Sequence, residues 1–231
     1  SGAHRRNWGH GVFKTDVEGR KRHNLSYLLV DMKTPGITVN PIKFMDMGVI
    51  YCEVFFDDAH IPAKNLVGTE NEGWAVTQLL AGFERSGLEA IMGMQGQLEQ
   101  LVKHCNETKV NGEPLARNPV IRNRVAEIAC EIEADRILAY RIADLQSRNE
   151  MAGFNASIVK VFTGELTERM GFLGTDILGL YGQVKTSKWA PQEGFWEKIY
   201  QQSFVYTISM GTDEIQKNIM AWYGLGLPRM H

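Results

Sequence analysis

The sequence predicts an α+β fold, with part of an antiparallel β domain over residues 1–70 and an up-down four-helix bundle over residues 71–231. Two observations support this division. Short β-rich runs recur at roughly ten-residue spacing in the first part. Long runs with apolar residues at helical spacing fill the second part. With 231 residues, of which 44% are hydrophobic, the chain can bury a substantial core.

Four strands are expected in the first part, over residues 7–15, 26–32, 37–44 and 49–56. They are rich in Val, Ile, Tyr and Phe, and Pro35 with Gly36 provides a turn before the third strand. A unit of this size seldom stands alone, because a small sheet leaves an apolar face uncovered. We therefore expect it to pack against further structure.

The apolar period changes to a helical one after Gly68. Helices are predicted over residues 73–107, 119–147 and 154–178, and a fourth over 199–209 that resumes near Asp213. A segment rich in Gly, Pro and Trp, residues 179–196, separates the third helix from the fourth. Helices of this length that are joined in sequence pack antiparallel as a bundle.

Composition excludes several classes of protein. The 25 basic and 27 acidic side chains nearly cancel, which argues against a nucleic-acid or anionic-membrane partner. No apolar run is long enough to span a bilayer. The three cysteines, Cys52, Cys105 and Cys130, have no disulfide or zinc spacing, so we expect reduced thiols and a cytosol-like compartment.

The segment GFERSG is the first candidate site, because Glu84 and Arg85 lie in an apolar helical stretch with glycines at positions 82, 87 and 93. A glycine inside a helix costs about 1 kcal/mol relative to alanine, so this cluster suggests close approach of a ligand or of another backbone. Glu84 is then either a solvated helix residue or a carboxylate beside a pocket that acts as a base.

The segment SMGTDEIQKNIM is the second candidate. Gly211 and Thr212 break one helix, and Thr212 or Asp213 can cap the next. The free N–H groups at such a helix start either hold a phosphate or belong to an ordinary capped helix. Dinucleotide-binding, P-loop, nucleophile-elbow and CxxC motifs are absent from the sequence, and the six histidines show no metal spacing.

The chain resembles the acyl-CoA dehydrogenase family over essentially its whole length. The resemblance lies in the order of SGAHRRNW, LLVDMKTPGITVNPI, EVFFDDAHIPAKNLVGTENEGW, GFERSG, ASIVKVF, DILGLYGQ and GTDEIQKNIMA. In that family a middle β domain leads into a C-terminal four-helix bundle. The resemblance therefore implies that the chain is a fragment, without the family's N-terminal helical domain and the first half of its β domain.

The resemblance implies FAD-dependent α,β-dehydrogenation of an acyl-CoA thioester to the trans-2-enoyl-CoA. A glutamate of the family removes the α proton, and the β hydrogen leaves as hydride to flavin N5. Many members carry this base immediately before the Gly-Thr of the C-terminal motif, where this chain has Met210. Others place it on the first bundle helix before an arginine, which matches Glu84 as the base and Arg85 as a substrate contact.

The resemblance also implies the FAD contacts. The segment GTDEIQ supplies four of these contacts: Gly211, Thr212, Glu214 and Gln216. The segment ILGLYG, which reaches the FAD of a neighbouring subunit in the family, supplies Gly179 and Gly182. Two departures stand out. KVNGEPLARNP replaces the common Arg-x-x-Phe-Gly motif, and Leu180 stands where a second glycine is frequent.

The partners that the resemblance implies are an acyl-CoA substrate, an electron-transfer-flavoprotein-like acceptor and further copies of the chain in a homotetramer (a dimer of dimers). It places the protein in fatty-acid β-oxidation, in the bacterial cytoplasm or the mitochondrial matrix. The segment NGEPLARNPVIRNRVAEI looks like a bacterial subgroup, some of whose members take bulky acyl chains. Two other functions fit the same residues: a catalytically silent scaffold subunit, and a flavin oxidase or monooxygenase that uses no CoA.

Overall fold

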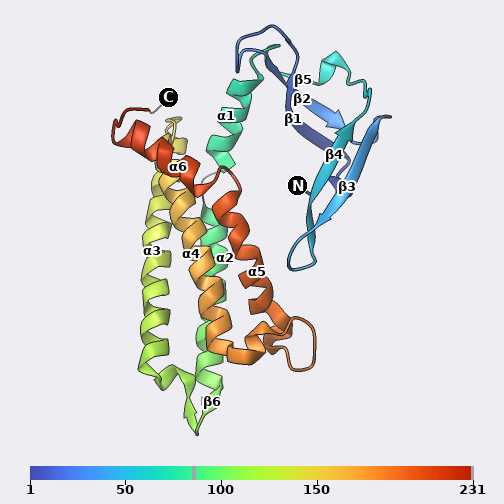
Figure 1. Ribbon diagram of the computed structural model, residues 1–231. Helices are drawn as coiled ribbons and strands as arrows, with labels where there is room; N and C mark the ends of the chain where they lie inside the picture. The colour runs from blue at the N-terminus through green and yellow to red at the C-terminus, as the bar shows by residue number, and fades with distance from the viewer. Residues whose placement is uncertain (85–86, 230–231) are drawn as a thin grey trace. The chain divides into compact units, whose positions relative to one another are not determined.

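A computed structural model describes residues 1–84 and 87–229 of the chain. The chain divides into two compact units, Ser1–Ala81 and Gly82–His231. The first unit holds most of the β-structure, and the second is helical (Figure 1). The α+β class predicted from the sequence is confirmed.

The first unit contains two small antiparallel sheets. In one sheet the strands β1 (Trp8–Lys14), β2 (Leu25–Asp31) and β5 (Leu66–Val67) lie in the order β1-β2-β5. The other is a hairpin of β3 (Ile37–Lys43) and β4 (Val49–Phe56), with a register shift between Pro41 and Lys43. The four predicted strands are therefore present, with ends that differ by at most one residue.

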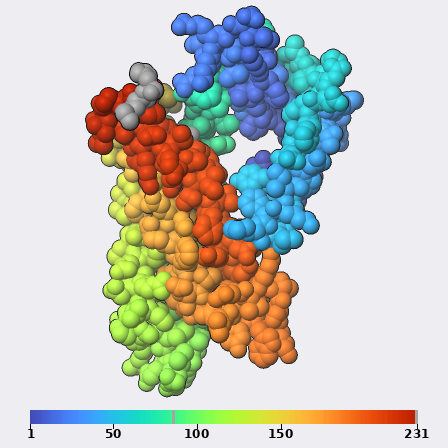
Figure 2. All heavy atoms as spheres, in the orientation of Figure 1, coloured from blue at the N-terminus to red at the C-terminus, as the bar shows by residue number. Residues whose placement is uncertain are grey.

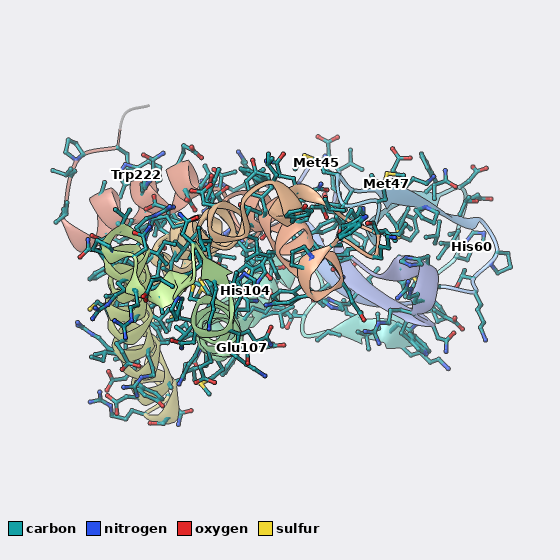
Figure 3. All side chains as sticks on the ribbon, turned by 90° about the horizontal axis from the view of Figure 1, so that it is seen from below. Met45, Met47, His60, His104, Glu107 and Trp222 are labelled. Atoms are coloured by element: carbon teal, nitrogen blue, oxygen red, sulfur yellow. The ribbon has the colours of Figure 1, made fainter. Side chains whose placement is uncertain are left out.

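The first unit buries few of its large apolar side chains. β2 supplies the best-buried ones, Tyr27 and Val30. In contrast, Phe55 and Phe56 of β4 are exposed, as are Met45 and Met47 near the turn between β3 and β4 (Figure 3). Exposed apolar groups of this kind mark surfaces that contact other structure or a ligand.

The second unit is built on four long helices that run up and down beside one another (Figure 1). They are α2 (Leu88–Glu107), α3 (Pro119–Ser147), α4 (Phe154–Leu178) and α5 (Phe195–Ile208). A short helix, α6 (Asp213–Ile219), follows α5 and packs on α4. Helix α3 begins at Pro119 because Asn118 caps it: the Asn118 side chain accepts hydrogen bonds from the N–H groups of Val120 and Ile121. Proline is favoured at the first position of a helix, which Pro119 occupies.

Two helix predictions need correction. The predicted helix over residues 73–107 is two helices, α1 (Gly73–Glu84) and α2, so Glu84 ends a helix instead of lying within one. Gly87 precedes α2 with a φ of 74°, a left-handed conformation that an α-helix cannot contain. The fourth helix begins at Phe195, not near residue 199, directly after Gly194, whose φ is 77°.

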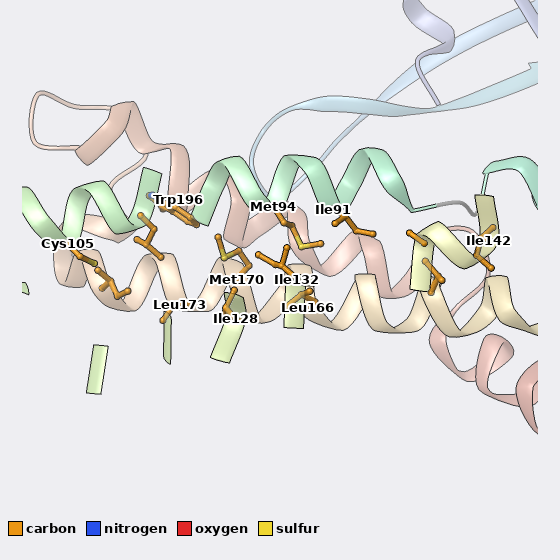
Figure 4. Close-up of a cluster of buried hydrophobic side chains, with 14 of the residues drawn as sticks. Ile91, Met94, Cys105, Ile128, Ile132, Ile142, Leu166, Met170, Leu173 and Trp196 are labelled. Carbon is orange, nitrogen blue, oxygen red and sulfur yellow. The ribbon is translucent and has the colours of Figure 1, made fainter. Parts of the chain in front are cut away.

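The core of the second unit is one apolar cluster shared by all four long helices (Figure 4). α4 is central and packs against α2, α3, α5 and α6. The fully buried members of the cluster come from every helix: Ile91 and Leu101 of α2, Ala139 and Ile142 of α3, Leu166 and Met170 of α4, and Trp196 of α5.

Glycines of α4 let α5 approach closely. A Cβ added to Gly174 would lie 1.9 Å from the Trp196 ring, and one added to Gly164 would lie 2.9 Å from the Tyr206 carbonyl oxygen. Gly171 faces the Tyr200 backbone in the same way, at 3.0 Å. The space-filling view shows the side chains of α4, α5 and α6, coloured orange to red, closing the gaps between the ribbons on this face (Figure 2).

Candidate functional site

A pocket of about 470 Å³ opens between α2, α4 and the end of α5, within the second unit. α2 and α4 contribute residues at helical spacing, so one face of each helix forms a wall. The lining is a mixture of small, apolar and polar residues: Glu84, Gly87, Glu89, Ala90, Gly93, Met94, Gln97, Val159, Lys160, Thr163, Gly164, Thr167, Tyr206 and Met210.

Glu84 and Met210 both line this pocket, although 126 positions separate them in the sequence. Glu84 is the last residue of α1 and is exposed. Met210 follows α5 with a φ of 56° and is 44% exposed. The two positions at which the family resemblance would place a catalytic base therefore face the same space. The sequence-predicted Arg85 lies outside the described residues.

The glycines near Glu84 have two different roles. Gly87 is closely packed, because an added Cβ would lie 2.7 Å from the Val159 Cγ1 of α4. Gly82 and Gly93 have nothing within 4 Å of an added Cβ, and Gly93 lines the pocket. The sequence suggested that these glycines allow close approach of a ligand or of another part of the chain. Packing against α4 accounts for Gly87, whereas Gly93 leaves open space in the pocket.

Gln97, Thr163 and Thr167 bring polar atoms to the pocket. The Thr163 hydroxyl donates a hydrogen bond to Asp135 Oδ2 at 2.8 Å, and the Thr167 hydroxyl donates to the Thr163 carbonyl oxygen at 2.7 Å. Gln97 Oε1 is buried and has no hydrogen-bond partner among the described residues. A buried amide oxygen without a partner costs free energy, because it has lost its hydrogen bonds to water.

Asp135 lies behind this wall on α3 and is fully buried. Burial raises the pKa of its carboxyl from 3.8 to about 6, and the hydrogen bond from Thr163 opposes this rise. Oδ1 of the same carboxyl has no partner among the described atoms. The protein therefore holds a carboxyl group that is costly to ionise next to the pocket.

Asp135 should make the stability of the fold depend on pH. The carboxyl titrates near pH 6 in the folded chain and near 3.8 in the unfolded chain, so the folded state binds its proton more tightly. The free energy of unfolding should then fall by roughly 3 kcal/mol as the pH rises from about 4 to about 6, and stay level above. Urea unfolding across this range should show the fall in the wild type but not in Asp135→Asn.

A matched control is Asp144→Asn, because Asp144 lies on the same helix and its side chain is exposed in an ion pair with Arg148. This variant should keep the wild-type fall between pH 4 and 6. An Asp135→Asn variant whose unfolding free energy follows the wild-type pH curve would contradict the assignment.

Lys160 and Asp213 form a buried ion pair, with Nζ 2.6 Å from Oδ1 and side-chain exposures of 2% and 9%. Lys160 Nζ also donates to the Thr207 carbonyl oxygen at 3.2 Å. One ammonium group of α4 thus holds the end of α5 and the first residue of α6. The segment between them, which contains Met210, is fixed at both ends.

The turn before α6 has the structure expected of a capped helix. Met210 and Gly211 have φ values of 56° and 86°, and the Thr212 hydroxyl accepts a hydrogen bond from the Ile215 N–H at 3.4 Å. Thr212, rather than Asp213, is therefore the cap. Gln216 points inward: it is 1% exposed, and its Nε2 donates to the Met210 carbonyl oxygen at 2.8 Å.

Glu214 is exposed at the start of α6. Hydrogen bonds from its own backbone N–H and from Thr212 lower the pKa of its carboxyl, and the positive charge of Lys217 acts in the same direction. Gly211 and Glu214 are accessible to a ligand, while Gln216 in this conformation supports the turn from behind.

Gly179 and Gly182 lie at the other end of α4. Gly179 is exposed with a φ of 62° and open space around an added Cβ, whereas Gly182 is packed 2.6 Å from the Thr175 carbonyl oxygen. Lys160 contacts α6, and the helix rises about 27 Å from there to its last residue, Leu178. A single chain therefore does not bring these glycines together with the turn before α6.

Three polar residues of this region were not predicted from the sequence: Asp135, Lys160 and Gln97. A signal existed for the first two. Asp135 interrupts the buried stripe of α3, and Lys160 interrupts the apolar run of ASIVKVF. A charge at a core position is rare unless it is paired or functional. Gln97 carries no such signal, because glutamines are common on exposed helix faces.

Within residues 1–84 and 87–229, no three His, Cys, Asp or Glu side chains gather in a way that would hold a metal ion. His104 and Glu107 lie near the end of α2, away from the pocket lining, and burial lowers the pKa of His104 (Figure 3). Among the described helices, none combines the length and apolarity that a bilayer crossing requires.

Comparison with known proteins identifies relatives of both units. The family model described as "Acyl-CoA dehydrogenase, C-terminal domain" matches residues 71–223. An acyl-CoA dehydrogenase of Bacillus subtilis is 31% identical over 220 residues, which cover 93% of this chain and 56% of that protein. Cyclohexane-1-carbonyl-CoA dehydrogenase of Geobacter metallireducens is 30% identical over 206 residues, which cover 87% of this chain and 52% of that protein.

The fold has a close counterpart among solved structures. The Tcur3481-Tcur3483 steroid ACAD superposes with a TM-score of 0.89 at 27% identity, over 100% of this chain and 59% of the solved one. The chain thus spans a little over half the length of the relatives that it matches.

Proposed function

Because the chain belongs to the acyl-CoA dehydrogenase family, we propose that the protein dehydrogenates an acyl-CoA thioester, with Glu84 as the catalytic base. The Glu84 carboxylate takes the proton from the α carbon, and a double bond forms between the α and β carbons as the β hydrogen leaves with its electron pair. FAD, when bound, supplies the acceptor for this hydride. The products are the trans-2-enoyl-CoA, the reduced cofactor and a protonated Glu84.

The observation that carries this proposal is that Glu84 and Met210 line one pocket. A methionine cannot take a proton, so a base supplied from the other wall would serve a substrate bound in the same position. Desolvation by a bound acyl chain would make a carboxylate there a stronger base.

Glu89 is the other carboxylate of the lining. It lies in the first turn of α2, where a negative charge stabilises the helix through its dipole, and this accounts for it without a catalytic role. Glu84 ends its helix and has no comparable structural role in the described part of the chain. We therefore assign the base to Glu84.

The described residues fit the proposed FAD in two places. At the turn before α6, Gly211 and Glu214 are exposed, Thr212 is half-buried, and Gln216 keeps a buried Oε1 without a described partner. These groups would hold polar parts of the cofactor, with Gln216 supporting the turn. Exposed Gly179, with open space beside it, would contact a second cofactor.

The distance along α4 between these two places supports a homo-oligomer. Because α4 rises about 27 Å between Lys160, which contacts α6, and Leu178, which precedes Gly179, the Gly179 region would complete a cofactor site built around the α6 turn of another copy. An electron-transfer-flavoprotein-like protein is the proposed acceptor of the electrons, as the family resemblance implies.

The proposed substrate carries a bulky acyl group. The pocket of about 470 Å³ falls in the usual range for small-molecule sites. Three residues of its lining at the start of α2 are small: Gly87, Ala90 and Gly93. The relatives include a cyclohexane-1-carbonyl-CoA dehydrogenase and a protein described as a steroid ACAD.

The visible spectrum of the purified full-length protein tests this function. We expect a yellow protein whose flavin absorbance bleaches when a bulky acyl-CoA is added without oxygen, and a trans-2-enoyl-CoA as product. A well-folded but colourless homomer would contradict the proposal and favour a scaffold subunit. Flavin that stays oxidised with acyl-CoA, in a protein that consumes oxygen with substrates lacking CoA, would favour an oxidase or monooxygenase.

A further inference from the structure

The last turn of α1 is joined to α3 by a side-chain hydrogen bond. Gln146 Nε2 donates to the Gly82 carbonyl oxygen at 2.9 Å, across 64 positions of the sequence. Both residues belong to the second unit. Carbonyl groups in the last turn of a helix have no partner further along that helix, so they can accept hydrogen bonds from side chains elsewhere. Gln146 therefore connects the bundle to the helix end that carries Glu84.

Gln146 occupies the next position on the buried face of α3. The buried residues of this helix recur every three or four positions: Ile128, Ile132, Asp135, Ala139 and Ile142. Gln146 follows Ile142, which Figure 4 labels, by four positions and thus lies one turn further along the same face. A half-buried amide at such a position needs a hydrogen-bond partner, and the Gly82 carbonyl oxygen provides it.

A second attachment to the bundle lies just beyond Glu84. Gly87 packs against Val159 of α4, since an added Cβ would lie 2.7 Å from Cγ1 of that residue. The Gly87 carbonyl oxygen also accepts a hydrogen bond from the Ile91 N–H at 3.1 Å, which begins α2. Glu84 is thus two residues from one attachment and three residues from the other.

The place of the Glu84 carboxylate in the pocket depends on these attachments. The side chain is exposed, so the backbone on either side of it must set its position. A reacting group that is misplaced by about 1 Å can lose roughly 100-fold in rate. The Gln146 bond is the attachment that a substitution can remove, because a side chain makes it, whereas Gly87 contributes only backbone.

Resting on the function proposed above, we infer that Gln146 is a positioning residue, which holds the end of α1 so that Glu84 reaches the α carbon of the substrate. Gln146 acts through the Gly82 backbone and is not among the residues that line the pocket. Loss of its amide should therefore slow proton removal without weakening the binding of substrate or cofactor.

The rate of flavin bleaching by acyl-CoA in the FAD-loaded full-length protein tests this role. In Gln146→Met, which keeps the side-chain length but has no donor, we expect a rate roughly 10- to 100-fold lower, with KM and FAD content nearly unchanged. Gln146→Lys provides a donor again and should restore most of the rate. Asn106→Leu is the control, because Asn106 Nδ2 donates to the Val102 carbonyl oxygen at 3.0 Å near the end of α2, outside the pocket lining.

Hydrogen exchange tests the attachment without any turnover. In Gln146→Met the backbone amides of residues 80–84 should exchange roughly tenfold faster than in the wild type, because the last turn of α1 opens more often. Asn106→Leu should leave exchange in these residues unchanged. Should Gln146→Met fail to fold, Gln146→Asn takes its place with the same expectations, since its amide is set back by one methylene.

The inference is overturned if Gln146→Met bleaches at the wild-type rate, or if its α1 amides exchange as slowly as those of the wild type. A Gln146→Lys variant as slow as Gln146→Met would also overturn it. A wild-type protein whose flavin does not bleach with acyl-CoA contradicts the dehydrogenase function instead. Hydrogen exchange then still decides whether Gln146 holds the end of α1.

Discussion

Glu84→Gln is expected to lower kcat by roughly 10²–10⁴-fold, because the amide keeps the shape of the side chain but cannot take the α proton. FAD content and acyl-CoA binding should stay close to wild type, since the Glu84 side chain is exposed at the end of α1. Stopped-flow measurement of flavin bleaching after mixing with acyl-CoA isolates the chemical step.

Two further variants make this result specific. Glu89→Gln removes the other carboxylate of the pocket lining and should change the bleaching rate by only a few-fold. M210E in the Glu84→Gln background should restore part of the lost rate, because position 210 lines the same pocket. Near-normal bleaching in Glu84→Gln, or a large loss in Glu89→Gln alone, would show that Glu84 is not the base.

Lys160→Met is expected to destabilise the fold by about 3–5 kcal/mol, because it leaves the Asp213 carboxylate buried without its ammonium partner. The lost contacts include the one to the Thr207 carbonyl oxygen, so the turn that carries Met210 should loosen as well. Urea unfolding followed by circular dichroism measures the change in unfolding free energy.

Lys217→Met is a matched control, because Lys217 also joins α6 to α4, through Glu165 at 2.8 Å, but at the surface. Its expected cost is about 1 kcal/mol or less. The double variant Lys160→Met with Asp213→Leu should recover most of the lost stability, since it removes both charges from the interior. Equal costs for Lys160→Met and Lys217→Met would refute the special role of the buried pair.

Much of the fold follows from local sequence patterns. The helices over residues 119–147 and 154–178 have the predicted ends, since Pro119 and the glycines at 153 and 179 mark them in the sequence. The break between α1 and α2 did not follow, because the apolar spacing continues through it. It depends on the left-handed Gly87 and on its contact with Val159 of α4, which is a tertiary effect.

The candidate site could be predicted only in part. The segments around Glu84 and Thr212 are visible in the sequence, and the structure places Met210 and Glu84 on one pocket. The partners of Asp135 and Lys160 lie 28 and 53 positions away, so no local pattern reveals them. The placement of Gln97 depends on the rotation of α2 against α4, which periodicity defines only as a broad face.

The length of α4 has a thermodynamic consequence for the proposed cofactor. Because one chain holds Gly179 far from the turn before α6, a cofactor that needs both regions is shared by two copies, and its affinity becomes a function of protein concentration. Each bound cofactor then strengthens subunit association by the same free energy with which association strengthens cofactor binding. Dilution and cofactor depletion are, in this arrangement, two routes to the same dissociated state.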